Sequence, residues 1–130
     1  MNATNKTKRY IELAKRIAHN SDYPCHRHGA ILVKGGSVLN VGFNKNQYNA
    51  FAARFRKPSL HATQHAELDC LLGVDRSKTS NSTVYVVRIN RQGQAKLSKP
   101  CTMCEKAMKF CGVKKVVYSV DEYNVESIRL

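Results

Sequence analysis

Thr83-Val84-Tyr85-Val86-Val87-Arg88-Ile89 carries the strongest strand signal in this sequence of 130 residues. The run is dominated by β-branched and aromatic side chains, which favour strands. Apolar runs at 30–33, 38–43 and 113–120 predict three further strands, and the turn at 34–37, with its two glycines, joins the first two as a hairpin. Segment 124–130 has a composition that fits either a short last strand or a helix.

Apolar residues at helical spacing predict helices at 5–20, 65–73 and 101–111. Residues 75–82 are expected to form a polar loop, and 44–63 a long basic connection with a short helical piece around Ala50–Arg54. Alternation of strands with helices predicts an α/β fold with a mixed, partly parallel sheet of four or five strands flanked by helices. The length predicts one domain that spans residues 1–130.

Two short motifs stand at the starts of the second and third predicted helices: His65-Ala66-Glu67 and Pro100-Cys101-Thr102-Met103-Cys104. An imidazole and two thiolates are preferred zinc ligands, and three protein ligands leave the fourth tetrahedral position open for water, as in catalytic zinc sites. We therefore expect His65, Cys101 and Cys104 to bind Zn²⁺. Glu67 is not needed as a ligand and could carry protons beside that water, so the set of residues indicates hydrolysis.

Other interpretations of the cysteines and histidines remain open at this point. A C-x-x-C pair also occurs in redox sites and in closed structural zinc sites, where Cys25 or His61 could be the fourth ligand. A second, structural zinc could be held by residues outside the two motifs: Cys25, His26, His28 and His61. Cys70 and Cys111 fall inside predicted helices and are expected to be reduced thiols in the core.

The formal net charge is +13, from 22 Lys and Arg against nine Asp and Glu. Such an excess favours anionic partners, either nucleic acid or phosphorylated small molecules, although basic residues can also serve only to solvate the surface. No apolar run approaches the roughly 20 residues that span a bilayer, and the N-terminus lacks the apolar region of a signal peptide. We expect a soluble, cytoplasmic protein without a membrane partner.

Together with the two metal motifs, Gly29-Ala30-Ile31-Leu32-Val33 and Gly42-Phe43-Asn44 resemble the cytidine deaminase superfamily. The resemblance runs from about Tyr10 to Tyr118 and is to the branch with His-Cys-Cys zinc ligation, which includes deoxycytidylate, tRNA adenosine and polynucleotide cytosine deaminases. It implies the three-layer cytidine deaminase-like fold. It also implies hydrolytic deamination, with zinc-bound hydroxide as the nucleophile and Glu67 as the proton shuttle.

The same resemblance suggests residues that contact the substrate. Asn44 matches the family residue that contacts the sugar or ring, although an asparagine after a strand is also an ordinary turn residue. The backbone N–H of Ala66 would bind the base carbonyl. Basic and aromatic residues of the 44–63 connection are candidates for phosphate binding or base stacking: Arg54, Arg56, Lys57, Phe51 and Phe55.

Three features bear on the branch. Lys99 stands where the vertebrate mutator deaminases carry Trp, which counts against that branch. Met103 and Ala107-Met108 resemble the tRNA adenosine deaminases. The long 45–63 connection resembles that of the deoxycytidylate deaminases.

We predict conversion of cytosine to uracil in a free nucleotide or nucleoside, of ribose or deoxyribose form. The alternatives are deamination of cytosine or adenine within single-stranded DNA or RNA, tRNA included, and a non-enzymatic basic zinc module that binds nucleic acid. By analogy, we expect a homo-oligomer.

Overall fold

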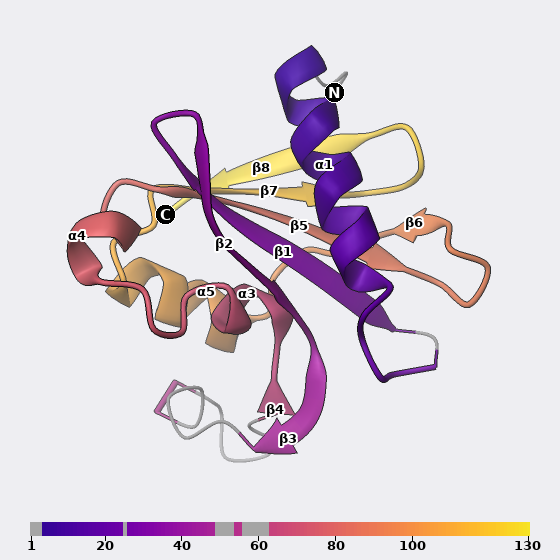
Figure 1. Ribbon diagram of the computed structural model, residues 1–130, viewed down its shortest axis with the longest axis horizontal. Coiled ribbons are helices and arrows are strands. Elements are labelled where there is room, and N and C mark those ends of the chain that lie inside the picture. The colour runs from indigo at the N-terminus through magenta and orange to yellow at the C-terminus, as the bar shows by residue number, and fades with distance from the viewer. Residues whose placement is uncertain (1–3, 25, 49–53, 56–62) are drawn as a thin grey trace.

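The computed structural model of the chain describes residues 4–24, 26–48, 54–55 and 63–130, and within them one mixed sheet organises the fold (Figure 1). Five strands lie in the order β2-β1-β5-β7-β8, and a short β6 adds to β5. The β5–β7 pair is parallel and the other pairs are antiparallel. The strands are β1 Arg27–Lys34, β2 Ser37–Phe43, β5 Thr83–Ile89, β6 Ala95–Lys96, β7 Lys115–Ser119 and β8 Val125–Arg129.

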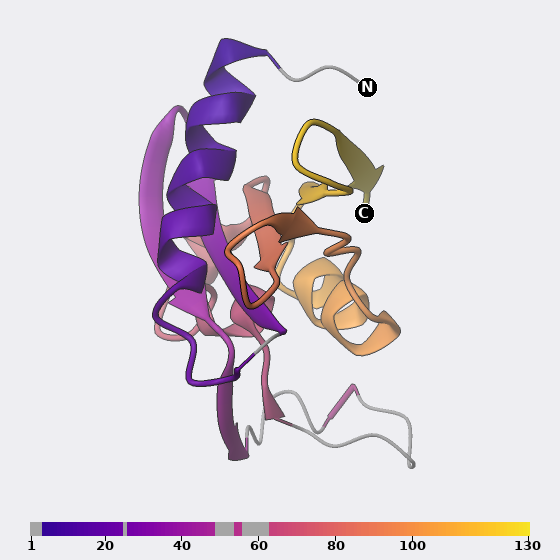
Figure 2. The ribbon, with the colours of Figure 1, turned by 90° about the vertical axis from the view of Figure 1, so that its right-hand side faces the viewer.

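Helices cover both faces of this sheet, as the side view in Figure 2 shows. Helix α1 (Asn5–Ala18) lies on one face, and α3 (Ala66–Asp69) and α5 (Thr102–Phe110) lie on the other. The arrangement confirms the predicted α/β class with helices on both sides of a mixed sheet. In the described part of the chain, no helix combines the length and apolar character needed to cross a membrane.

Strand β5, the stretch with the strongest sequence signal, lies at the centre of the sheet. It pairs with β1 along its whole length, with β7 over residues 83–86 and with β6 over residues 88–89. Its side chains alternate between the two cores because successive residues of a strand face opposite ways. Val84 and Val86 pack toward α3 and α5, whereas Tyr85 and Val87 pack toward α1.

Two glycines of the family-like motifs allow helices to approach the sheet closely. A Cβ on Gly29 of β1 would collide with the α1 backbone at Ala14 and Ala18. A Cβ on Gly42 of β2 would collide with the amide nitrogen of Cys70 and lie 2.8 Å from the carbonyl oxygen of Ala66. Both positions therefore need a residue without a side chain, and Gly42 determines how closely α3 approaches β2.

Three segments differ from the sequence-based expectation. Strand β3 (Lys45–Tyr48) pairs with β4 (Thr63–Gln64) as a separate two-stranded ribbon, where we expected an unpaired connection. A helical turn, α4 (Arg76–Thr79), lies in the expected polar loop, and helix α3 is shorter than the expected 65–73. The helical piece expected around Ala50–Arg54 falls almost wholly outside the described residues.

These differences have tertiary causes. Pairing of β3 with β4 joins segments far apart in sequence, which local propensity does not report. Helix α4 is capped by Asp75, whose carboxylate accepts a hydrogen bond from the Ser77 N–H at 2.9 Å. Its last residue, Thr79, is fully buried and donates to the carbonyl oxygen of Cys111 at 2.7 Å. Segment 124–130 forms a strand because its backbone can pair antiparallel with β7.

Candidate functional site

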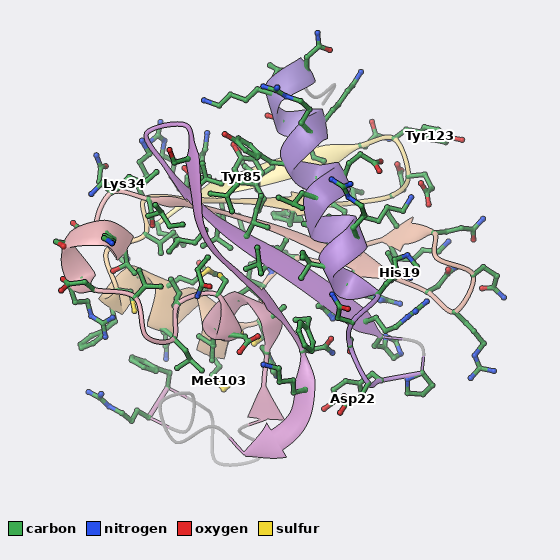
Figure 3. The ribbon with its side chains drawn as sticks, in the orientation of Figure 1. His19, Asp22, Lys34, Tyr85, Met103 and Tyr123 are labelled. Atoms are coloured by element: carbon green, nitrogen blue, oxygen red, sulfur yellow. The ribbon has the colours of Figure 1, made fainter. Side chains whose placement is uncertain are left out.

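The two metal motifs meet on the α3–α5 side of the sheet. His65 is the N-cap of α3 and Cys101 the N-cap of α5, both with extended backbone, and Cys104 lies in the first turn of α5. Neither cap side chain bonds to its own helix. Figure 3 shows Met103, between the two cysteines in sequence, beside α3 and α5. The helix starts therefore bring three donor side chains together from segments 36 to 39 residues apart.

The distances between these donors fit a zinc ion. Nδ1 of His65 lies 3.1 Å from Sγ of Cys104 and 3.7 Å from Sγ of Cys101, and the three donor atoms all lie within 4.8 Å of one another. Tetrahedral zinc with ordinary bond lengths separates nitrogen and sulfur ligands by about 3.5 Å. Among the described residues, no fourth Cys, His, Asp or Glu joins the group. The described residues thus supply three ligands, the number that catalytic zinc sites use; Cys25 and His61, the possible fourth ligands, lie outside the described residues.

The three donors differ in the direction of their pKa shifts. A hydrogen bond from Cys104 lowers the pKa of Cys101 to about 4, with a further contribution from His65. The same hydrogen bond and burial raise the pKa of Cys104 well above its usual value. Bonding to Cys101 likewise raises the pKa of His65. Cys101 thus supplies a thiolate, and a bound cation would displace the protons of Cys104 and His65.

Glu67 lies two residues after His65, in α3, and is almost fully buried, with 4% of its surface exposed. Burial raises the pKa of its carboxyl group, and the nearby charge of His65 partly opposes that rise. A carboxyl group whose pKa is raised toward the working pH can both take up and release protons. This is the property that a proton shuttle needs.

A cavity of about 330 Å³ opens beside the cluster. Its size lies in the range of small-molecule sites. Its lining joins the metal motifs to the segment before β1 and to the end of β2: Tyr23, His26, His28, Asn44, His65, Glu67, Lys99 and Cys101. The lining therefore includes two of the three expected ligands, the expected proton carrier and the expected substrate residue Asn44.

Asn44 lines this cavity, but its amide group is bound to the protein. Its Oδ1 accepts a hydrogen bond from the His28 N–H at 2.8 Å, and its Nδ2 donates to the carbonyl oxygen of His26 at 2.8 Å. The residue is 9% exposed. Asn44 thus ties the segment before β1 to the end of β2 and shapes the cavity wall. Direct contact with a substrate, which the sequence suggested, remains a prediction.

Ala66 is the first residue of α3 and is fully buried next to the cluster. The first N–H groups of a helix have no partner within the helix and can bind an oxygen atom from outside it. This position is compatible with the expected contact to a base carbonyl.

Arg54 lies outside the cavity lining, beside the end of α5. Its guanidinium group is 5.4 Å from the ring centroid of Phe110 and 5.8 Å from that of Phe55, a cation–π arrangement. Phe110 ends α5, about 13 Å along the helix from Cys101. Arg54 and Phe55 are not in the cavity lining. The other candidates from this connection, Phe51, Arg56 and Lys57, lie outside the described residues.

Four lining residues had no assigned substrate role in the sequence-based interpretation: Tyr23, His26, His28 and Lys99. His28 was considered with His26 as a ligand for a second zinc, and the described histidines form no cluster of three potential ligands outside the His65 group. Cys25 and His61, the other members of that suggested site, lie outside the described residues. The position of His28 directly before the Gly29 motif was the available sequence signal.

Comparison with known families identifies the class of protein. The model of the cytidine and deoxycytidylate deaminase zinc-binding region matches residues 4–120, and the chain belongs to this family. No match was found among curated protein sequences. Family membership and the His-Cys-Cys donor set both fit Zn²⁺ as the cofactor.

Solved structures share the fold. A cytidine deaminase from Burkholderia pseudomallei aligns with a TM-score of 0.67 and 23% identity, over 98% of this chain and 93% of that one. A dCMP deaminase from cyanophage S-TIM5, in complex with dCMP and dUMP, aligns with a TM-score of 0.58 and 25% identity, over 89% and 82%. Acinetobacter baumannii RibD aligns with a TM-score of 0.58 and 20% identity over 88% of this chain, which spans 28% of the RibD chain.

Proposed function

We propose that this chain is a zinc-dependent hydrolytic deaminase that converts cytosine to uracil in a free nucleotide or nucleoside. The observation that carries the proposal is a cluster of three zinc-type donors, two of which line one cavity together with a buried carboxyl group. Membership in the deaminase family supports an enzyme of this kind. The similarity to the cyanophage dCMP deaminase, whose structure contains dCMP and dUMP, supports a pyrimidine nucleotide as the substrate.

In this proposal, His65, Cys101 and Cys104 hold the zinc ion. When bound, zinc would supply a Lewis acid that makes a water molecule acidic enough to attack near neutral pH. Glu67 takes the proton from the attacking water and gives it to the ring nitrogen N3. Glu67 then carries a second proton to the departing amino group, so that one water is consumed, ammonia leaves and the water oxygen becomes the uracil carbonyl oxygen.

The buried position of Glu67 supports this assignment. A carboxyl group shielded from bulk water exchanges protons with the reacting atoms instead of losing them to solvent. The Ala66 N–H would bind the carbonyl oxygen of the cytosine base and orient the ring toward Glu67. A purely structural zinc site would give no reason for a buried carboxyl group beside the donors.

The test is an ammonia-release assay of the purified zinc protein on cytidine, deoxycytidine, CMP, dCMP, adenosine, single-stranded DNA and a tRNA pool. Turnover confined to the cytosine monomers supports the proposal. Turnover confined to polymers, suppressed by salt, contradicts it and supports the nucleic-acid alternative, because each phosphate contact adds nearly one unit to the log–log salt slope. Absence of turnover on every substrate, with zinc bound, favours the non-enzymatic alternative.

A further inference from the structure

One imidazole in the cavity wall has a fixed proton. Nδ1 of His28 lies 3.2 Å from the carbonyl oxygen of His26. A carbonyl oxygen can only accept, so Nδ1 must carry the ring proton in this hydrogen bond. In a neutral ring, Nε2 is then left with its lone pair and can only accept a hydrogen bond.

His28 is held neutral by its surroundings. Burial lowers the pKa of His28 to about 4, and the hydrogen bond to His26 opposes this only partly. The positive charge of Arg88, directly across on β5, lowers it further. A neutral ring with a protonated Nδ1 is therefore the state present near pH 7.

Nε2 is the atom of this ring that remains for a ligand. His28 lines the cavity, and among the described residues no hydrogen bond to its Nε2 is found. The wall around it is rigid, because Asn44 bonds both to the His28 N–H and to the same His26 carbonyl oxygen that accepts from Nδ1. That carbonyl oxygen thus has two donors, and the imidazole cannot easily turn.

A cytosine nucleotide carries few hydrogen-bond donors that could meet this acceptor. Its exocyclic amino group must lie at the zinc end of the cavity, beside Glu67, if it is to leave as ammonia. Ionised phosphate oxygens only accept hydrogen bonds. The sugar hydroxyl groups are the remaining donors.

We propose, building on the proposed function, that Nε2 of His28 accepts a hydrogen bond from a sugar hydroxyl group of the substrate. His28 is then a specificity-determining residue, and Asn44 is a positioning residue that acts through it. The cavity consequently discriminates among sugars through the neutral acceptor of His28 on its β1 wall.

The experiment compares kcat/KM for cytidine, 2′-deoxycytidine, 3′-deoxycytidine and 2′,3′-dideoxycytidine, as nucleosides and as 5′-monophosphates. For the wild-type protein, loss of the contacted hydroxyl should lower kcat/KM by about 10- to 100-fold, because a buried acceptor is left unsatisfied. In His28→Leu, the substrates with and without that hydroxyl group should differ in kcat/KM by no more than about threefold. His28→Gln, which keeps an acceptor near the position of Nε2, should restore part of the discrimination.

His19→Leu is the matched control. His19 is exposed at the end of α1, away from the cavity lining, and Figure 3 shows it there. This variant should keep the wild-type discrimination. Equal discrimination by wild type and His28→Leu would overturn the inference, whereas absence of turnover on every cytosine substrate would overturn the proposed function itself.

Nitrogen-15 NMR of the imidazoles tests the inference without turnover, and also if His28→Leu does not fold. The wild-type spectrum should show His28 with a protonated Nδ1, and its Nε2 resonance should shift when cytidine is added. A protonated Nε2, or an Nε2 resonance unchanged at saturating cytidine, would overturn the inference.

Discussion

Glu67 is the residue whose chemistry is tested most directly. Replacement by Gln keeps the shape of the side chain and removes its proton-carrying ability. We expect Glu67→Gln to bind zinc as the wild type does and to lose kcat by about 10²- to 10⁴-fold. Metal analysis and ammonia release measure the two properties. Glu12→Gln, on the exposed side of α1, should leave both unchanged; substantial turnover by Glu67→Gln would contradict the shuttle role.

The five cysteines provide a matched pair of substitutions. Cys101 and Cys111 flank α5 at its two ends, and only Cys101 belongs to the donor cluster. Changing a group next to a ligand typically costs 10- to 100-fold in metal affinity, so Cys101→Ser should cost more than about 100-fold. Cys111→Ser should keep one zinc per chain. Competition with a chromogenic chelator measures both affinities, and equal losses would contradict the ligand assignment.

His28 should leave a signature in the pH dependence of stability. Its pKa falls from 6.5 to about 4 on folding because of burial. The unfolded chain therefore binds more protons between these values, and stability is lost as pH falls from 6.5 toward 4. This contribution reaches at most about 3 kcal/mol. For wild type and His28→Leu at equal zinc saturation, urea unfolding should give free energies whose difference changes by up to about 3 kcal/mol as pH falls from 6.5 toward 4. Parallel curves would contradict a buried neutral His28.

At the scale of elements, α3 depends on its neighbours. Four residues make too few internal hydrogen bonds to be stable alone. The helix is attached to β2 and β3 through Asp69, which accepts from the Phe43 N–H at 3.0 Å and pairs with Lys45 at 3.0 Å. The Asn40 side chain donates to the carbonyl oxygen of Cys70 at 3.0 Å. The sheet edge thus positions the helix that carries Glu67.

Gly42→Ala tests this dependence. The added methyl group would press on the α3 backbone at Ala66 and Cys70, at a cost of about 1–3 kcal/mol. It should also lower activity, because the first turn of α3 has to move. Urea unfolding and ammonia release measure the two effects. Gly36→Ala, in an open hairpin turn, should lose some stability through its positive φ of 79° and keep full specific activity. Full activity in Gly42→Ala would contradict the positioning role of this contact.

For the whole molecule, zinc is expected to add stability to a fold that forms without it. The two hydrophobic cores lie on opposite faces of the sheet and consist mostly of residues independent of the metal, such as Ile31, Leu32 and Val86, although Cys104 belongs to one of them. Chelation should therefore leave far-UV circular dichroism nearly unchanged. At free zinc 100-fold above the dissociation constant, the free energy of unfolding should rise by about 2.7 kcal/mol. The zinc-dependent rise should disappear in Cys101→Ser; loss of secondary structure on chelation would contradict this picture.

The sequence by itself determined the elements with strong local patterns and the chemistry of the metal motifs. Thr83–Ile89 is rich in β-branched residues along its whole length, and α1 has a clear helical period, so both follow from local preference. The types and spacing of His65, Cys101 and Cys104 indicated a zinc site because an imidazole and two thiolates are ligands that zinc prefers.

Only the tertiary structure decided what depends on partners distant in sequence. Segment 124–130 contains a strand because its backbone pairs with the edge of β7. Thr79 is buried with its hydroxyl group donating a hydrogen bond to the Cys111 carbonyl oxygen. Asn44 is held in the cavity wall by hydrogen bonds to the backbone of His26 and His28. His28 lines the cavity because β1 begins beside the metal motifs. Local sequence does not specify such contacts, since their energy arises only after the chain has brought the two segments together.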